Sequence, residues 1–288
     1  MSDLRNIRRL LAFFLSLTLL LLAGCTAPEQ TAAGAAEGVF EGLEVTVLDA
    51  GKADAILLTT PDSAVLIDCG EKGFGSEILE ALAARGIERL DLLIVTHFDR
   101  DHVGGAAKVI GGIEIARVLQ SPLPKASDEY RKYLRALEKV SLEPETPRET
   151  LSFTLGGVEY TVDPPQREHF ERDESNNSSL IVTAVYGKTR LLFMGDAQTA
   201  RICEYLASSP PRCDLIKLPH HGEKEKMLDA LLASVKPAYA VITCSAAEPE
   251  APSTAAALQA AGVESYLTRL GAVRIRSDGE TLDVSYLG

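Results

Sequence analysis

The segment His97-Phe98-Asp99-Arg100-Asp101-His102 constrains this chain more than any other, because it places four side chains that can bind metal within six residues. It follows directly on the largely apolar run 90–96 and precedes the pair Gly104-Gly105. Charged groups at this density stay close to a core only where an ion or a partner neutralises them. The sequence therefore predicts a buried strand that ends in a metal-binding turn.

The spacing of these ligands predicts two ions. Alternate residues of an extended segment share a face, so His97 and Asp99 can point at one ion. Asp101 and His102 then enter a helix and can present ligands to a second ion, beside a glycine pair that lets the backbone turn tightly. The alternative is a polar strand-to-helix turn that Asp101 caps, with incidental histidines. Four of the five histidines lie in two tight pairs, the second at 220–221, and this clustering favours the metal interpretation.

Residues 1–24 have the pattern of a signal peptide. Three arginines precede an apolar run over residues 10–22, which is short for a membrane span and typical of a signal. The run closes on Leu22-Ala23-Gly24-Cys25, which resembles the lipobox of bacterial lipoproteins and implies that Cys25 is lipidated. A plain secretory signal and an uncleaved anchor are the alternatives. Residues 25–40 then form the lipidated cysteine and a flexible tether.

Charge and the N-terminus together predict the location of the protein. The chain has 41 acidic and 29 basic residues, a net charge of −12. Such a chain binds duplex nucleic acid poorly, because phosphate contacts need Lys and Arg. An anionic membrane surface would also repel it, so lipid must provide the anchor. We expect a monomer held by Cys25 at the extracytoplasmic face of a bacterial cell membrane.

Four further cysteines lie in the mature chain. Disulfides are permitted outside the cytoplasm, and the sequence leaves open whether Cys203 pairs with Cys213. Cys69 and Cys244 each end an apolar strand, where a cysteine is most often a small buried hydrophobe.

Residues 41–288 are predicted to form one α/β domain, because no long linker or repeat divides them. Strand-rich halves with interspersed helices fit two packed sheets covered by helices. The predicted strands are 44–48, 55–59, 64–68, 90–96, 158–162, 179–185, 190–194, 214–218, 239–243, 264–268, 272–276 and 281–286, and the predicted helices are 75–85, 126–139, 197–207, 224–234 and 254–261.

From about residue 43 onward the chain resembles the metallo-β-lactamase fold superfamily, and more narrowly its competence-type (ComEC-like) secreted hydrolase branch. Six ordered motifs carry the resemblance: VLDAGKADA from Val47, LIDCG from Leu66, THFDRDHVGG from Thr96, NNSSL from Asn176, MGDA from Met194 and LPHHG from Leu218. The resemblance implies a four-layer αββα sandwich with a metal site in loops at one edge of the sheets.

The resemblance also implies further ligands. Asp196 would bridge two divalent ions, His221 would complete the ligand set, and His220 beside it would act as a proton donor. Many superfamily members have histidine where Asp99 stands. A carboxylate there hardens the site and moves its preference from zinc toward manganese or iron, without deciding which metal is bound.

Several positions around the site depart from the family pattern. Lys52 stands where glutamine is usual, and Glu223 stands where serine often follows the histidine pair. Residues 250–253 replace a Tyr-Gly-His-Pro element. No further histidine lies next to Asn176, and His169 is expected at the surface. The metal ligands are therefore retained while the substrate rim is altered.

These features predict a metal-dependent hydrolase. Water held between two ions has its pKa lowered enough to give hydroxide near neutral pH. Asp99 or Asp101 would orient this hydroxide, and His220 would protonate the leaving group. A phosphodiester is the expected substrate, in a nuclease-like or phosphocholine-ester-like reaction on an envelope polymer or on extracellular nucleic acid. The acidic surface argues against long duplex DNA.

Two features bear on the choice of function. A modest basic cluster of Lys217, Lys224 and Lys226 is expected near the histidine pair. The altered rim supports the alternative of a non-catalytic binding or accessory lipoprotein that keeps the fold. Retention of all four ligands in the 97–102 segment favours the enzyme.

Overall fold

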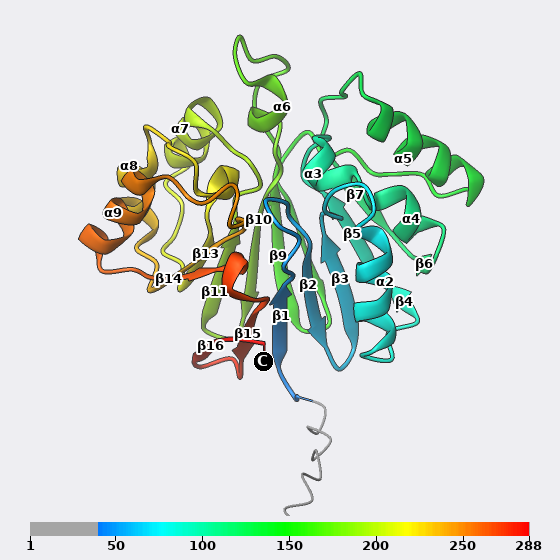
Figure 1. Ribbon diagram of the computed structural model, residues 1–288, viewed down its shortest axis with the longest axis horizontal. Helices are drawn as coiled ribbons and strands as arrows, with labels where there is room; N and C mark the ends of the chain where they lie inside the picture. The colour runs from blue at the N-terminus through cyan, green and yellow to red at the C-terminus, as the bar shows by residue number, and fades with distance from the viewer. Residues whose placement is uncertain (1–39, 288) are drawn as a thin grey trace, which may run out of the picture. The chain divides into compact units, whose positions relative to one another are not determined.

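The structure is a computed structural model and describes residues 40–287 of the chain. Two seven-stranded sheets lie face to face, and helices cover the outer surface of each sheet (Figure 1). This is the predicted four-layer αββα arrangement. The signal peptide over 1–24, Cys25 and almost all of the tether over 25–40 lie outside the described residues.

The first sheet has the strand order β16-β15-β1-β2-β3-β5-β7. Its strands are antiparallel except for the parallel pairs β3–β5 and β5–β7. Every residue of β3 and β5 is buried, as expected for strands covered on both faces. The bounds are Leu43–Val47 (β1), Ile56–Thr60 (β2), Ser63–Ile67 (β3), Leu92–Val95 (β5), Val118–Gln120 (β7), Val273–Ser277 (β15) and Leu282–Tyr286 (β16).

The second sheet has the strand order β14-β13-β12-β11-β10-β9-β8. The strands from β11 to β14 are parallel, and those from β8 to β11 are antiparallel. The bounds are Leu151–Leu155 (β8), Val158–Asp163 (β9), Ile181–Tyr186 (β10), Thr189–Phe193 (β11), Leu215–Lys217 (β12), Tyr239–Ile242 (β13) and Glu264–Leu267 (β14). A small separate sheet pairs β4 (Arg89–Leu90) with β6 (Glu114–Ile115).

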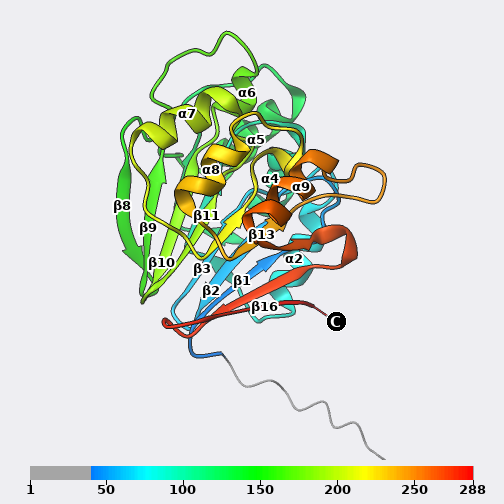
Figure 2. The same ribbon diagram turned by 90° about the vertical axis from the view of Figure 1, so that its left-hand side faces the viewer.

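The helices fall into two groups, one over each sheet (Figure 1), and Figure 2 faces the group that covers the second sheet. The helices over the first sheet are α2 (Gly75–Ala83), α3 (Arg100–Val103), α4 (Ala106–Ile110) and α5 (Asp128–Lys139). The helices in the second half of the chain are α6 (Glu174–Asn177), α7 (Thr199–Ala207), α8 (Leu228–Val235) and α9 (Pro252–Ala261). Within residues 40–287, every helix is too short or too polar to cross a membrane.

Three apolar clusters hold the four layers together. One fills the space between the sheets and includes Val45, Val182 and Phe193. The second packs the first sheet against its helices, and the third does the same for the second sheet. Because the central strands of each sheet are buried on both faces, polar residues in these strands are candidates for a function.

The topology gathers the ends of several strands at one edge. Parallel neighbours point the same way, so β3 and β5 end together in the first sheet and β11, β12 and β13 end together in the second. The segments that follow these strands carry the predicted ligands, and they include α3 and η1, the single turn Pro219–Gly222. Ligand sites form at such edges of parallel strands.

Candidate metal centre

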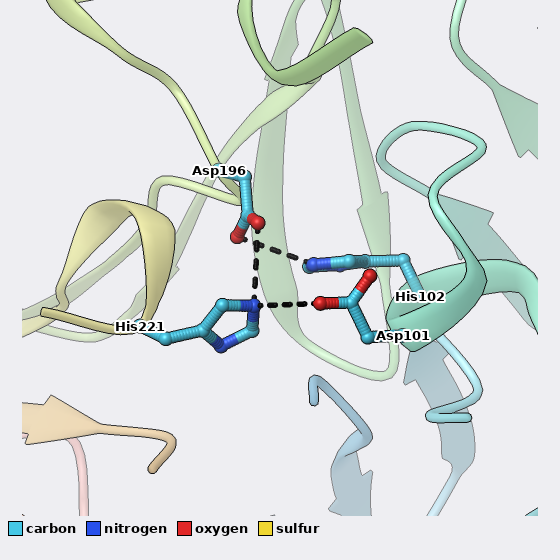
Figure 3. A group of neighbouring side chains, drawn as sticks. All are labelled: Asp101, His102, Asp196 and His221. Atoms are coloured by element: carbon cyan, nitrogen blue, oxygen red, sulfur yellow. Dashed lines mark ion pairs between the residues drawn. The ribbon is translucent and has the colours of Figure 1, made fainter. Parts of the chain in front are cut away.

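Four side chains from three separate segments converge at this edge (Figure 3). His102 Nε2 lies 3.2 Å from Asp196 Oδ1, and His221 Nε2 lies 3.2 Å from Asp196 Oδ2. His221 Nε2 also lies 3.3 Å from Asp101 Oδ2. The ligand atoms of these four residues all lie within 4.8 Å of one another. Folding therefore brings together residues that are more than 90 positions apart in the chain.

The polar atoms that face the centre of this cluster lack hydrogen bonds. Within the described part of the chain, His97 Nε2, His102 Nε2, Asp196 Oδ1 and His221 Nε2 are buried and make none. The 3.2 Å contacts are close in distance, but they do not satisfy hydrogen-bond geometry. Buried polar atoms without a partner are costly, and cations bound among these side chains would satisfy them. The residues therefore fit a divalent metal.

His97 and Asp99 lie near Asp196 but are not members of the four-residue group. His97 Nε2 is 3.9 Å from Asp196 Oδ2 and 4.0 Å from Asp99 Oδ1. Because His221 faces the same oxygen of Asp196, this carboxylate lies within reach of both sets of predicted ligands. Asp99 Oδ1 also accepts hydrogen bonds from Lys125 Nζ at 2.5 Å and from Ser175.

Hydrogen bonds on the far side of two imidazoles fix their orientation. Thr243 Oγ1 donates to Asp54 Oδ1 at 2.7 Å, so its oxygen is left to accept from His221 Nδ1 at 2.9 Å. His102 Nδ1 contacts Asp68 Oδ2 at 2.8 Å, where a carboxylate can only accept. Both rings therefore carry the proton on Nδ1 when neutral and aim the Nε2 lone pair at the site.

His97 is held in the same way. Thr96 Oγ1 donates to Asp68 Oδ2 at 2.6 Å, and its oxygen accepts from His97 Nδ1 at 3.1 Å. The hydroxyl of Ser179 lies 3.4 Å from the same ring nitrogen and accepts from the backbone N–H of Asp196 at 3.0 Å. Three imidazoles are thus preset as ligands.

Lys217 is placed differently from the prediction. Together with Lys224 and Lys226 it was expected in a modest basic cluster near the histidine pair, but it is fully buried, and only the other two are exposed. Its ammonium group donates to Asp54 and to the Gly195 carbonyl at 3.2 Å. It also lies 3.8 Å from Asp196 Oδ1. The sequence prediction was wrong here because β12 is covered on both faces.

The buried residues behind the ligands were not assigned a role from sequence. Asp54 is 1% exposed and Asp68 is 0% exposed, and with His102 they form a second His/carboxylate group. Both lie within the quoted motifs. The signal that could have identified them is a charged residue directly beside an apolar strand. Lys217 in the run Leu215-Ile216-Lys217-Leu218 has the same signal.

The backbone at the site is strained. His220 and His221 have φ values of 47° and 52°, and Asp68 has a φ of 59°. Non-glycine residues in the left-handed region are uncommon, and when they occur together they often mark functional sites. Gly105 is required for a different reason than the predicted tight turn, because a Cβ there would lie 2.2 Å from the Cys69 carbonyl oxygen.

Electrostatic effects give the ligands different protonation states in the absence of an ion. Burial and the neighbouring His102 lower the pKa of His97 to about 3. Burial disfavours the charged form of His221, but the carboxylates of Asp196 and Asp101 outweigh it and raise the pKa to about 9. Burial also opposes the charged form of Asp196, yet the two histidines beside it hold its pKa well below the usual range. A metal ion must therefore displace protons from this cluster.

His220 lies beside the centre and faces a groove. Gln198 Nε2 lies 3.0 Å from its Nδ1, and Asn176 Nδ2 lies 3.3 Å from its Nε2. One of these amides must present its oxygen, since a neutral imidazole has one donor and one acceptor. The groove of about 710 Å³ along which His220 lies is also lined by Lys224 and Lys226.

The structure also tests the predictions for His169, for the cysteines and for the rim of the site. His169 is at the surface and pairs with Glu174 at 2.7 Å. The sequence left open a disulfide between Cys203 and Cys213. It is not formed, and the cysteines of the described residues are all free. At the rim, Lys52 pairs with Glu223.

The fold and this site together define an αββα protein with a His/carboxylate metal centre. Residues 48–245 match the family model described as the metallo-beta-lactamase superfamily. The chain belongs to that superfamily. Its members bind divalent metals and are in general metal-dependent hydrolases, and the His/Asp groups described above are of the kind that holds such ions.

Similar proteins come from competence systems. The chain is 26% identical over 205 residues to Recombination protein 2 of Haemophilus influenzae, with 69% of this chain and 24% of that protein covered. It is 26% identical over 222 residues to ComE operon protein 3 of Bacillus subtilis, with 69% and 28% covered. The chain thus spans about a quarter of the length of these relatives. They are consistent with the ComEC-like branch.

Solved structures show the same fold. The metallo-beta-lactamase fold protein YhfI from Bacillus subtilis aligns with a TM-score of 0.54 at 12% identity, covering 78% of this chain and 96% of that one. CmlA, a diiron beta-hydroxylase from Streptomyces venezuelae, aligns with a TM-score of 0.53 at 16% identity, covering 83% and 54%. At these identities the likeness concerns the fold alone.

Proposed function

We propose that this domain is a metal-dependent hydrolase of phosphodiesters. The observation that carries the proposal is the set of four buried ligand atoms without hydrogen bonds, which face one another across the site. A protein that no longer binds metal gains nothing from keeping so many buried charges. Two divalent ions bound there would act as Lewis acids and lower the pKa of water.

Two residues of the chain would carry out the remaining steps of the reaction. Asp101 is 22% exposed and faces His221 with one oxygen, so its carboxylate can orient water at the open side of the site. His220 is 20% exposed and lies on the groove, where it can give a proton to a leaving group. Both its ring nitrogens are engaged by amides, so proton donation requires one of those contacts to open.

The net charge of the chain limits the range of possible substrates. A net charge of −12 opposes binding of long duplex DNA, although the competence-type relatives bring nucleic acids in as candidates. We therefore favour short or single phosphodiesters, including phosphocholine-type esters of envelope polymers. Manganese and zinc are both candidate ions, since the ligand set mixes imidazole with carboxylate.

Metal analysis and a turnover assay test the hydrolase. The purified domain is loaded with Mn²⁺ or Zn²⁺ and assayed with bis(p-nitrophenyl) phosphate. We expect bound metal and turnover in the wild type, and loss of turnover in Asp101→Ala. The matched control is Asp62→Ala, an exposed aspartate in the β2–β3 turn, at the opposite end of these strands from the site. A metal-free protein without turnover would instead support the accessory lipoprotein.

We further propose that lipid on Cys25 holds the protein, as a monomer, at the extracytoplasmic face of the cell membrane. The lipobox-like sequence before Cys25 supports this location, and the acidic charge means that lipid and not charge would have to provide the attachment. Membrane fractionation of the full chain tests it. We expect Cys25→Ser to move the protein out of the membrane fraction, while Cys203→Ser, which removes an exposed cysteine, leaves it there. Retention of both variants would contradict the lipid anchor.

A further inference from the structure

A charge pair joins the two halves of the domain at the rim of the metal centre. Lys52, in the loop between β1 and β2 of the first sheet, donates from Nζ to Glu223 Oε1. Glu223 follows the histidine pair at the end of β12 in the second sheet. The Lys52 side chain is 20% exposed and that of Glu223 is 45% exposed, so the pair is open to a ligand from solvent.

Both members of the pair are tied to site residues. Two residues after Lys52, the backbone N–H of Asp54 donates to the Asp101 carbonyl at 3.1 Å, which fixes the loop to the metal-binding turn. The backbone N–H of Glu223 donates to the His220 carbonyl at 2.9 Å, and its Oε2 lies 3.7 Å from His220 Nδ1. The Lys52 ammonium is also attracted by the Asp101 carboxylate. Glu248 Oε1 also lies 4.0 Å from the Lys52 ammonium, and the second carboxylate oxygen of Glu223 lies beside His220.

Apart from the metal ions, an anionic substrate would meet mainly carboxylates at this site. Asp99, Asp101 and Asp196 place carboxylates around the space where the reaction would occur. Lys217 is buried behind them and cannot reach a ligand. Lys52 has three N–H donors, and its hydrogen bond to Glu223 leaves others available.

We propose that Lys52 binds the anionic oxygen of the substrate and selects a charged phosphodiester over a neutral ester, with Glu223 holding the ammonium in place. This inference rests on the proposed function of the same site. It also explains two departures from the family pattern together, since Lys52 and Glu223 replace neutral residues at positions that the fold brings into contact. A charge-assisted hydrogen bond of this kind is roughly twice as strong as a neutral one.

Ligand binding tests the inference without requiring turnover. The metal-loaded domain is titrated, with NMR detection, with diethyl phosphate and with its neutral triester, triethyl phosphate. We expect Lys52→Gln to bind diethyl phosphate about tenfold more weakly, which corresponds to about 1.4 kcal/mol, and to bind the triester unchanged. Lys52→Arg should retain the affinity, and the metal content should be the same throughout. An equal change for both ligands, or no change, would overturn the proposal.

A double variant separates direct contact from charge balance. Lys52→Gln alone leaves Glu223 unpaired beside the site, and repulsion by that carboxylate could weaken anion binding. Lys52→Gln/Glu223→Gln keeps the net charge of the rim. If Lys52 contacts the anion, the double variant stays at least fivefold weaker than the wild type. Recovery of wild-type affinity would show that only the charge balance matters, and would overturn the inference.

Kinetics distinguish this inference from the hydrolase proposal. With bis(p-nitrophenyl) phosphate we expect Lys52→Gln to raise KM about tenfold and to leave kcat unchanged. If the loaded wild type hydrolyses nothing, the hydrolase proposal fails, and the binding titrations still decide the role of Lys52. If the wild type is active and Lys52→Gln has an unchanged KM, the role of Lys52 fails alone.

Discussion

Substitution of Lys217 by methionine should destabilise the metal-free protein strongly. The Lys217 side chain is fully buried, and its ammonium contacts Asp54 and lies 3.8 Å from Asp196 Oδ1. Methionine fills a similar volume but removes the charge that both carboxylates face. Asp54 would then be buried with only the Thr243 hydroxyl and more distant histidines to stabilise its charge.

The size of the effect follows from these distances. With an effective dielectric constant near 20, two unit charges 3.8 Å apart attract by about 4 kcal/mol. Breaking a buried pair by removing one partner generally costs about 3–5 kcal/mol. We therefore expect Lys217→Met to lower the free energy of unfolding by about 3–5 kcal/mol. That is a large part of the roughly 5–15 kcal/mol by which a domain is stable.

Urea unfolding of the metal-free protein, followed by circular dichroism, measures this free energy. The matched control is Lys188→Met, because Lys188 pairs with Glu280 at 2.7 Å while both side chains stay exposed. Such a surface pair should contribute less than about 1 kcal/mol. Asp54→Asn/Lys217→Met should be more stable than Lys217→Met alone, because no unpaired charge remains at that pair. If Lys217→Met costs no more than the Lys188 control, the reasoning about a buried counter-charge is refuted.

Three further outcomes follow from the site. The raised pKa of His221 stabilises the metal-free fold below pH 6.5, and this contribution, about 3 kcal/mol, is lost as the pH rises through about 9. Urea unfolding across that range should show the loss, whereas metal affinity should increase, because the ion needs the neutral ring. Asp196→Asn should bind less metal by elemental analysis than Asp62→Asn, since Asp196 faces both ligand groups. Calorimetric titration with the metal ion should resolve two affinities at least about tenfold apart. One position has Asp101, His102 and His221 beside Asp196, and the other has only His97 and Asp99. Two equal affinities would contradict this expectation.

The fold could be predicted largely from local patterns. Long apolar runs such as 64–68 and 190–194 correspond to buried strands, and the charged segment 126–139 corresponds to α5. The strands that were not predicted are β4, β6 and β7, with two or three residues each, and β8 at a sheet edge. With two or three residues each, β4, β6 and β7 are too short to show a period. Their existence depends on the neighbouring strands with which they pair.

The helix predicted over 224–234 begins only at Leu228. Before it, the Glu225 carboxylate accepts hydrogen bonds from the Met227 backbone at 3.1 Å and from the Thr199 hydroxyl. The first of these is a local turn that competes with a helix. The second joins α7 to this segment, and such a contact cannot be derived from the sequence around residue 225.

The site was predictable to the extent that its residues are adjacent in sequence. The segment 97–102 contains its ligands within one turn, so their type and spacing are sufficient to propose a metal. The placement of Lys217 could not be derived in the same way, because its sequence position beside the histidine pair also fits a surface lysine. Only the pairing of β12 between β11 and β13 shows that it is buried. The role of a single charged residue in a strand depends on what the other elements place against it.

Asp54 shows why the metal centre and the fold are coupled. It precedes β2 in the first sheet, yet its carboxylate accepts from Thr243 and Lys217, which belong to the second sheet. Thr243 in turn orients His221, while the backbone of Asp54 is bonded to Asp101. Neither half of the domain can therefore form the ligand set alone. Because the site exists only when both sheets are packed together, the free energy of metal binding stabilises the packing of the two sheets as well as the loops that hold the ion.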